Sequence, residues 1–325
     1  MNSLTKKIIA RLLKIKPKGF VYFGHGVCDQ LKSEYIEQLH ITRRQLVELI
    51  EFWKDLGVEF LSMDDLLKMR RSGKSSRKPW IHFTFDDGYR NNLTTLLPVM
   101  EEYKIPFTVF VTAGLVEKQE YMPTFYIRVA VMYSQKEWEC TKTGLKLTNG
   151  MNTREKQNLA DKLCACYKYL PQNEGVDFIN EIKNLLSPDE WSKYKSVYSN
   201  DQLMTVDELK SLNNSSLVTI GAHSHSHLIF HEHQSKSDVF YEIKEPKNWL
   251  ENHLGINTKV MAFPNGTEKD YNAKVVQTVK DAGYQLAFTT HERFIGINDE
   301  DLLLPRNFLH PKAGSILKEM LKSIL

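Results

Sequence analysis

Short apolar segments alternate with amphipathic helical segments along most of this 325-residue chain. The apolar segments are rich in β-branched and aromatic residues, and near-continuous apolar runs are typical of parallel strands buried on both faces. We expect strands at residues 20–23, 58–61, 80–85, 106–111, 218–220, 260–263, 286–289 and 302–304. This order predicts an α/β fold, a distorted (β/α) barrel of about seven parallel strands with outer helices.

The alternation lapses between about residues 115 and 202, where amphipathic helical patterns follow one another. We expect a helical insertion there, acting either as a substrate lid or as an oligomer contact, and the sequence does not favour one over the other. The predicted organisation is a basic amphipathic segment at 1–17, a barrel domain at 18–312 that contains the insertion, and an amphipathic C-terminal helix at 313–325.

Composition and charge restrict the partners of the chain. The 43 Lys and Arg against 40 Asp and Glu give a formal charge of +3, too little for the basic surface that nucleic-acid binding requires. The four cysteines form no CxxC pair, which favours structural cysteines in a reducing compartment. With no apolar run of about 20 residues and no apolar core of a secretion signal, we expect a cytoplasmic protein. The basic segment at 1–17 suggests either a weak contact with the inner face of the membrane or a solvated or packed helix.

Two adjacent acids end the predicted strand at 80–85. Side chains of neighbouring residues at a strand end point in different directions, so one of Asp86 and Asp87 can bind a cation while the other stays free as a base. The alternative is a pair of acids in a solvated turn.

Two histidines four residues apart follow the predicted strand at 218–220. His223 and His227 can converge on one ion if the loop turns back, whereas His225 would then point elsewhere. We expect His225 at the surface, with a supporting contact to the ligands as the alternative. One carboxylate and two imidazoles at strand ends make a metal site with open positions for water and substrate. A solvated histidine-rich loop is the competing interpretation.

These residues resemble the motifs of a known family. Residues 84–88, Thr-Phe-Asp-Asp-Gly, and 223–227, His-Ser-x-x-His, look like the first two motifs of the polysaccharide deacetylase family, the NodB homology domain of carbohydrate esterase family 4. Residues 262–266, Ala-Phe-Pro-Asn-Gly, resemble the third motif, which usually ends Pro-Tyr-Gly. The resemblance covers about residues 20–306 and implies a metal-dependent N-deacetylase. The implied substrate is an N-acetylated amino sugar of a surface glycan, or its lipid-linked or nucleotide-linked precursor.

The resemblance also assigns roles to residues at the matching positions. It implies that Asp86 is the general base and that Asp87, His223 and His227 hold a divalent metal, most often Zn²⁺. A zinc ion lowers the pKa of bound water towards about 7, which suits a reaction in which a neighbouring carboxylate takes the proton.

The acid that protonates the leaving amine has two candidates. In many family members it is a histidine near the C-terminus, for which His310 is the nearest match. In a circularly permuted subgroup, which includes poly-N-acetylglucosamine deacetylases, it lies on the first strand, and residues 21–26 around His25 resemble that arrangement. We prefer His25 because it ends a predicted barrel strand, and a buried structural histidine is the alternative.

The third motif departs from the family pattern at two positions. Ala262 stands where many relatives have an arginine that orients the base, and Asn265 replaces the usual tyrosine. We hypothesise that Arg306 reaches Asp86 and replaces the missing cation, with a surface arginine as the alternative. Pro264 and Asn265 are expected at the substrate, where a backbone N–H would stabilise the oxyanion.

The motifs leave other functions open. A deformylase or another linear amide hydrolase would use the same site residues. A non-catalytic glycan-binding or assembly protein would account for the altered third motif, but a scaffold that only binds metal has no need of Asp86.

Overall fold

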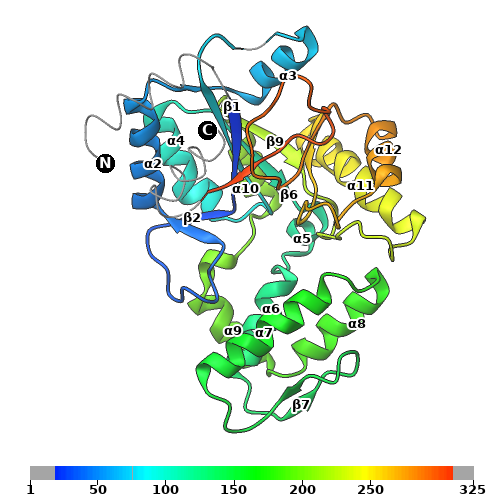
Figure 1. The fold of residues 1–325 in the computed structure, drawn as a ribbon. Coiled ribbons are helices and arrows are strands. Elements are labelled where there is room, and N and C mark those ends of the chain that lie inside the picture. Colours follow the sequence, from blue (N-terminus) through cyan, green and yellow to red (C-terminus); the bar gives the residue numbers. More distant parts are fainter. Residues whose placement is uncertain (1–18, 75, 310–325) are drawn as a thin grey trace.

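The structure, a computed structural model, describes residues 19–74 and 76–309. The predicted basic segment at 1–17, the candidate acid His310 and the predicted helix at 313–325 lie outside the described residues. Figure 1 shows two parts, a barrel and a body of helices beside it.

Eight strands form the barrel wall, and every pairing between them is parallel. The order is β11, β10, β9, β6, β5, β1, β12, with β4 also paired to β5. The strands are β1 (Gly19–Gly24), β4 (Glu59–Phe60), β5 (Trp80–Phe85), β6 (Phe107–Val111), β9 (Val218–Ala222), β10 (Val260–Ala262), β11 (Leu286–Phe288) and β12 (Asn307–Phe308). A bridge from Phe288 to Leu304 brings the chain leading to β12 alongside β11, so the wall is nearly closed. The predicted parallel barrel is confirmed.

Only Leu304 of the last predicted strand, at 302–304, pairs with a neighbouring strand. Leu302 and Leu303 lie in a turn, in which Leu303 donates its N–H to Glu300, and the last strand is β12, which follows at 307–308. The two leucines pack against the main core cluster. Their apolar character therefore reflects burial by packing, which does not require strand pairing.

Helices cover the outside of the barrel (Figure 1). They are α2 (Arg43–Asp55), α3 (Met63–Ser72), the π-helix η1 (Asn92–Leu96), α4 (Leu97–Tyr103), α5 (Ala113–Lys118), α10 (Val206–Asn213), α11 (Lys236–Leu254) and α12 (Ala273–Asp281). Thr42 and Thr205 begin α2 and α10 with capping boxes, which satisfy backbone N–H groups that have no partner inside the helix. None of the helices in the described part of the chain is both long and apolar enough to cross a membrane.

The predicted insertion forms the second part of the molecule. It contains α6 (Pro123–Tyr133), α7 (Thr153–Tyr167), α8 (Gln172–Lys183), α9 (Pro188–Val197) and the antiparallel pair β7 (Trp138–Glu139) and β8 (Lys146–Leu147), and the short 3₁₀-helix η2 (Ser199–Asp201) leads back to the barrel. These elements bury an apolar cluster of their own, which includes Phe125, Leu163 and Phe178. The insertion therefore has a core distinct from that of the barrel.

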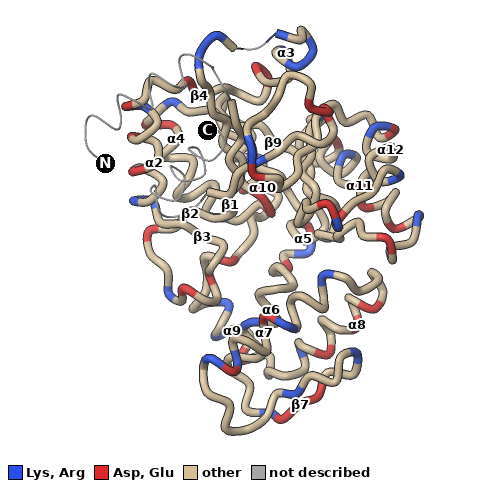
Figure 2. The backbone as a smooth tube through the Cα atoms, in the orientation of Figure 1, with Lys and Arg blue, Asp and Glu red and all other residues tan. Residues whose placement is uncertain are grey.

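A second, smaller sheet lies outside the barrel wall. A parallel pair, β2 (Gly26–Cys28) and β3 (His40–Thr42), follows β1. The four cysteines are all free. Basic and acidic residues are interspersed over the barrel and the insertion (Figure 2).

Candidate active site

Three ligand-type side chains come together at the carboxyl edge of the barrel. Asp87 follows β5, and His223 and His227 follow β9. The Nε2 atoms of both histidines lie 3.5 Å from Asp87 Oδ1, and the three ligand atoms all lie within 4.8 Å of one another. The structure therefore brings together the two stretches of chain that the sequence pattern pairs.

The chain reaches this arrangement through unusual backbone conformations. Asp87, Ser224 and His227 have φ angles of 75°, 56° and 63°, in the left-handed region that non-glycine residues seldom adopt. Such a residue costs about 1 to 3 kcal/mol, and it persists only where the surrounding contacts hold it. Here the backbone N–H of His223 donates to Val111 at 2.9 Å, which ties the start of the loop to the neighbouring strand.

The hydrogen bonds and charges of the cluster fit a divalent cation. His223 Nδ1 lies 3.0 Å from the carbonyl oxygen of Ala262, which only accepts, so Nδ1 carries the proton and Nε2 is free to bind. Asp87 Oδ1 is buried and has no hydrogen-bond donor among the described residues. Burial and the adjacent Asp86 raise the pKa of Asp87 well above its ordinary value, whereas burial lowers the pKa of His223 and His227. A carboxylate that lacks a donor beside two neutral imidazoles is a ligand set that suits zinc and similar ions.

The second carboxylate has a different environment, because it pairs with an arginine. Arg306 is completely buried and donates from Nη1 to Asp86 Oδ1 at 2.7 Å and from Nη2 to Oδ2 at 2.9 Å. The hypothesised contact is present, and the alternative of a surface arginine is wrong. Burial raises the pKa of Asp86, but Arg306 and His223 outweigh this effect and bring the pKa down to about 2. Asp86 is therefore ionised, with Oδ2 at 3.9 Å from His223 Nε2.

His25 lies between β1 and β2 and is half-buried. Its carbonyl oxygen accepts a hydrogen bond from Asn92 Nδ2 at 2.8 Å, so the π-helix η1 helps to fix the turn. Burial lowers the pKa of His25 to about 4, although the charge of Asp86 opposes the shift. The ring is thus neutral near pH 7 and lies within electrostatic reach of Asp86.

The third motif forms a loop after β10 that contacts the insertion. Asn265, which follows Pro264, has a φ of 64°. Its Oδ1 accepts from Lys168 Nζ at 2.9 Å, and its Nδ2 donates to Asp270 Oδ2 at 3.0 Å. The asparagine side chain therefore joins the barrel rim to residue 168 in the turn after α7.

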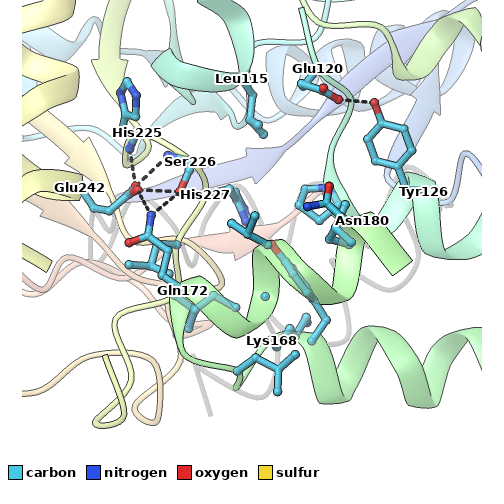
Figure 3. Close-up of a pocket in the computed structure, with 18 of the residues that line it drawn as sticks. Leu115, Glu120, Tyr126, Lys168, Gln172, Asn180, His225, Ser226, His227 and Glu242 are labelled. Carbon is cyan, nitrogen blue, oxygen red and sulfur yellow. Dashed lines mark hydrogen bonds between the residues drawn. The ribbon is translucent and has the colours of Figure 1, made fainter. Parts of the chain in front are cut away.

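The expectation that His225 lies at the surface was wrong, since its exposed fraction is 8%. The ring packs over Gly114, where a Cβ atom would come within 2.5 Å of it. A fully buried acid on α11, Glu242, accepts from the backbone N–H of His225 at 2.9 Å and of Ser226 at 2.7 Å, and from the Ser226 hydroxyl at 2.6 Å (Figure 3). Glu242 thus holds the loop that joins His223 to His227.

Sequence reasoning did not identify Glu242 or Lys168. Lys168 lies 97 residues from its partner Asn265 in the sequence. Glu242 lies 17 and 16 residues from His225 and Ser226, and no motif links these positions. One signal was available for Glu242, which shares its helix face with the buried Val239, Ile243 and Pro246. An acid on an apolar helix face needs buried hydrogen-bond donors.

The sequence of this chain matches the model of a known protein family. The profile of the polysaccharide deacetylase family matches residues 73–179 and 180–287, about two thirds of the chain. The chain therefore belongs to the polysaccharide deacetylase family.

Individual relatives are more distant. A poly-β-1,6-N-acetyl-D-glucosamine N-deacetylase of Staphylococcus aureus (strain MSSA476) is 29% identical over 128 residues, which cover 39% of this chain and 39% of that protein. The match thus spans well under half the length of the curated relative.

Solved structures match over nearly the whole chain. The Streptococcus pyogenes deacetylase PplD, in complex with acetate, has a TM-score of 0.60 at 16% identity and covers 95% of this chain and 98% of its own. IcaB from Ammonifex degensii has a TM-score of 0.57 at 16% identity, covering 94% and 97%. At these identities the likeness shows a shared fold.

Proposed function

We propose that this protein is a divalent-metal-dependent N-deacetylase. Its substrate would be an N-acetylated amino sugar of a surface glycan, or a lipid-linked or nucleotide-linked precursor of one. The observation that carries the proposal is the cluster of Asp87, His223 and His227 beside the ion-paired Asp86. Membership of the family and the named activity of the Staphylococcus aureus relative support an amino-sugar amide as the bond that is cleaved.

We infer that Zn²⁺ is the ion, held by Asp87 Oδ1 and by one nitrogen from each histidine. Two imidazoles and one carboxylate are typical ligands of catalytic zinc, which keeps a further position open. When bound, zinc supplies Lewis-acid chemistry that polarises a carbonyl group and makes water more acidic.

Asp86 would accept the proton of the attacking water. Both of its oxygens are held by Arg306, and Thr84 Oγ1 lies 3.1 Å from the same guanidinium. The arginine therefore fixes the carboxylate in one orientation and keeps it ionised, as a proton acceptor must be.

His25 would protonate the leaving amine, as the resemblance to the permuted subgroup implies. Its pKa of about 4 keeps it neutral before the reaction. Negative charge that develops on the substrate raises the pKa of a nearby imidazole, so His25 would take up a proton from solvent and then pass it to the leaving amine. The backbone N–H of Asn265, the residue after Pro264, would donate to the oxyanion.

We further propose a cytoplasmic location, with the substrate presented at the inner face of the membrane. The basic segment at 1–17 would then make a weak contact with anionic lipid. Deleting that segment is expected to reduce binding to anionic liposomes, and unchanged binding would rule out the contact.

A release assay tests the proposed activity. The protein is stripped of metal, reloaded with zinc and incubated with N-acetylated amino-sugar oligosaccharides and with their N-formyl counterparts. We expect acetate release that depends on zinc. Preferential formate release would indicate a deformylase, and binding of the sugars without release of either acid would indicate a glycan-binding protein.

A further inference from the structure

A cavity of about 370 Å³ lies between the barrel rim and the helical insertion. One wall comes from α6, α7, α8 and the turn between α7 and α8, and the other from residues 225–229 of the histidine loop (Figure 3). His227 belongs to this lining and to the ligand cluster at the same time. The cavity therefore adjoins, at His227, the site where the amide would be cleaved.

Hydrogen bonds from the α7–α8 turn hold the two walls together. Gln172 Nε2 donates to Glu242 at 2.9 Å, and the Gln172 backbone N–H donates to Gln234 at 3.0 Å. Gln234 in turn donates to the carbonyl oxygen of Leu170 at 3.1 Å. Because the turn is fixed to the loop that carries the metal ligands, the cavity is preformed, as ligand sites usually are.

The lining combines aromatic faces with hydrogen-bonding groups. Four tyrosines contribute, Tyr121, Tyr126, Tyr167 and Tyr241. Asn180, Gln172 and Lys168 add polar groups, and Figure 3 shows Asn180 on the side opposite Glu242. Tyrosine rings offer apolar surface together with a polar group, which suits a sugar ring with its hydroxyl groups. A purely apolar chain would desolvate these polar groups without offering them further hydrogen bonds, at a cost in binding free energy.

The two carboxylates of the lining do not require a cationic ligand. Glu120 accepts hydrogen bonds from the Tyr126 hydroxyl and, at 2.9 Å, from Lys183 Nζ. Glu242 is satisfied by the loop amides and by Gln172. Both carboxylates are thus already engaged within the protein, and an uncharged ligand leaves them undisturbed.

We propose that this cavity, the insertion subsite, binds the sugar unit attached to the one that loses its acyl group. The proposal rests on the function proposed above and deepens it by giving the insertion a role in substrate selection. A substrate of two or more sugar units would make contacts there that a single amino sugar does not make.

A tryptophan on α8 tests the subsite. Val176 lines the cavity with an exposed fraction of 56%, so Val176→Trp fills the space without disturbing the core. Val197 on α9 is 43% exposed and does not belong to this lining, so Val197→Trp is the matched control. The measured quantity is the ratio of kcat/KM for β-1,6-linked N-acetylglucosamine disaccharide to that for methyl N-acetylglucosaminide.

We expect this ratio to be about tenfold or more in the wild type and in Val197→Trp, and to fall towards one in Val176→Trp. A folding defect would lower both rates and keep the ratio. A ratio near one in the wild type, or an unchanged ratio in Val176→Trp, would overturn the proposal. So would a preference for the octyl glycoside over the methyl glycoside that only Val176→Trp removes, because the occupant would then be an apolar chain.

A binding measurement distinguishes failure of the subsite proposal from failure of the proposed deacetylase function. If the wild type releases no acetate from any of these sugars, calorimetry with the disaccharide replaces the rate measurement. Binding that Val176→Trp alone abolishes would support the subsite even then, and equal or absent binding would rule it out.

Discussion

The barrel rim and the helical insertion meet at the same site but hold their polar groups in different ways. On the rim, Asp86, Asp87 and Arg306 are 3%, 1% and 0% exposed, and charges so deeply buried need partners. On the insertion, Lys168 and Gln172 are half-buried and make hydrogen bonds to uncharged Asn265 and to Glu242 and Gln234.

This difference predicts that the rim and the insertion have different roles, the rim in chemistry and metal binding and the insertion in substrate binding. Rim substitutions disturb buried charge, so they should affect chemistry, metal binding or stability, according to the residue changed. Insertion substitutions should affect substrate binding and leave the rim intact, because α6 to α9 pack around their own apolar cluster. Single substitutions on each side can test this division.

The largest effect is expected from Asp86→Asn. The amide keeps the shape of the side chain but cannot accept the proton, so kcat should fall by about a thousandfold. Zinc binding should remain, since the ligands are the other three side chains. Acetate release and metal content measured on the same preparation check both halves. Activity close to that of the wild type would mean that a group other than Asp86, such as one on the insertion, is the base.

Arg306→Met should cost about 3 kcal/mol in the free energy of unfolding, because it leaves a buried carboxylate unpaired. The folded pKa of Asp86 is about 2, below its ordinary 3.8. The ion pair therefore stabilises fully above about pH 4, and the contribution is lost as the pH falls towards 2.

Urea unfolding of the wild type and Arg306→Met at pH 6 and pH 3 measures this difference. The difference in unfolding free energy should be larger at pH 6 than at pH 3. The stability of Arg306→Lys should lie between those of the wild type and Arg306→Met, because lysine keeps the charge but loses the paired contacts. A difference that is the same at both pH values would contradict the ion-pair interpretation.

Glu242→Gln should weaken zinc binding by about tenfold, because Glu242 holds the loop between the histidine ligands. Glu251→Gln is the control, since it makes the same charge change at an exposed position of α11. Calorimetric zinc titration of both variants, with circular dichroism to check the fold, provides the measurement. Equal zinc affinity in the two variants would remove the positioning role of Glu242.

The smallest effect is expected from Lys168→Met on the insertion side. It removes one hydrogen bond to Asn265 and should lower kcat/KM by about threefold, with zinc affinity unchanged. Lys162→Met, at an exposed position of α7, is the matched control. A change in zinc affinity in Lys168→Met would show that the two regions do not act independently.

Local signals predicted the elements that depend on local physics. The sequences at 42–45, 187–190 and 205–208 have the capping-box pattern, which predicts the start of a helix. Thr42, Ser187 and Thr205 do begin helices in the structure, because each satisfies backbone groups within a few residues. The positions of Asp87 and His223 at strand ends followed in the same way, since parallel strands present their carboxyl ends at one edge.

Features that depend on distant contacts were missed. Helix α6 shows no apolar stripe because it is buried on several sides, by Phe125, Ile127, Val129 and other residues. The burial of His225 depends on the space that Gly114 leaves, more than 100 residues earlier in the chain. Such contacts follow from the fold and have no signal in the local sequence.

The central claim is that Asp87, His223 and His227 share one divalent ion. Zinc equilibrium dialysis with the wild type, Asp87→Asn, His227→Ala and the exposed control His233→Ala tests it most directly. We expect one tightly bound zinc per chain in the wild type and in His233→Ala, and a large loss of affinity in the other two. Wild-type zinc affinity in Asp87→Asn or His227→Ala would contradict the claim.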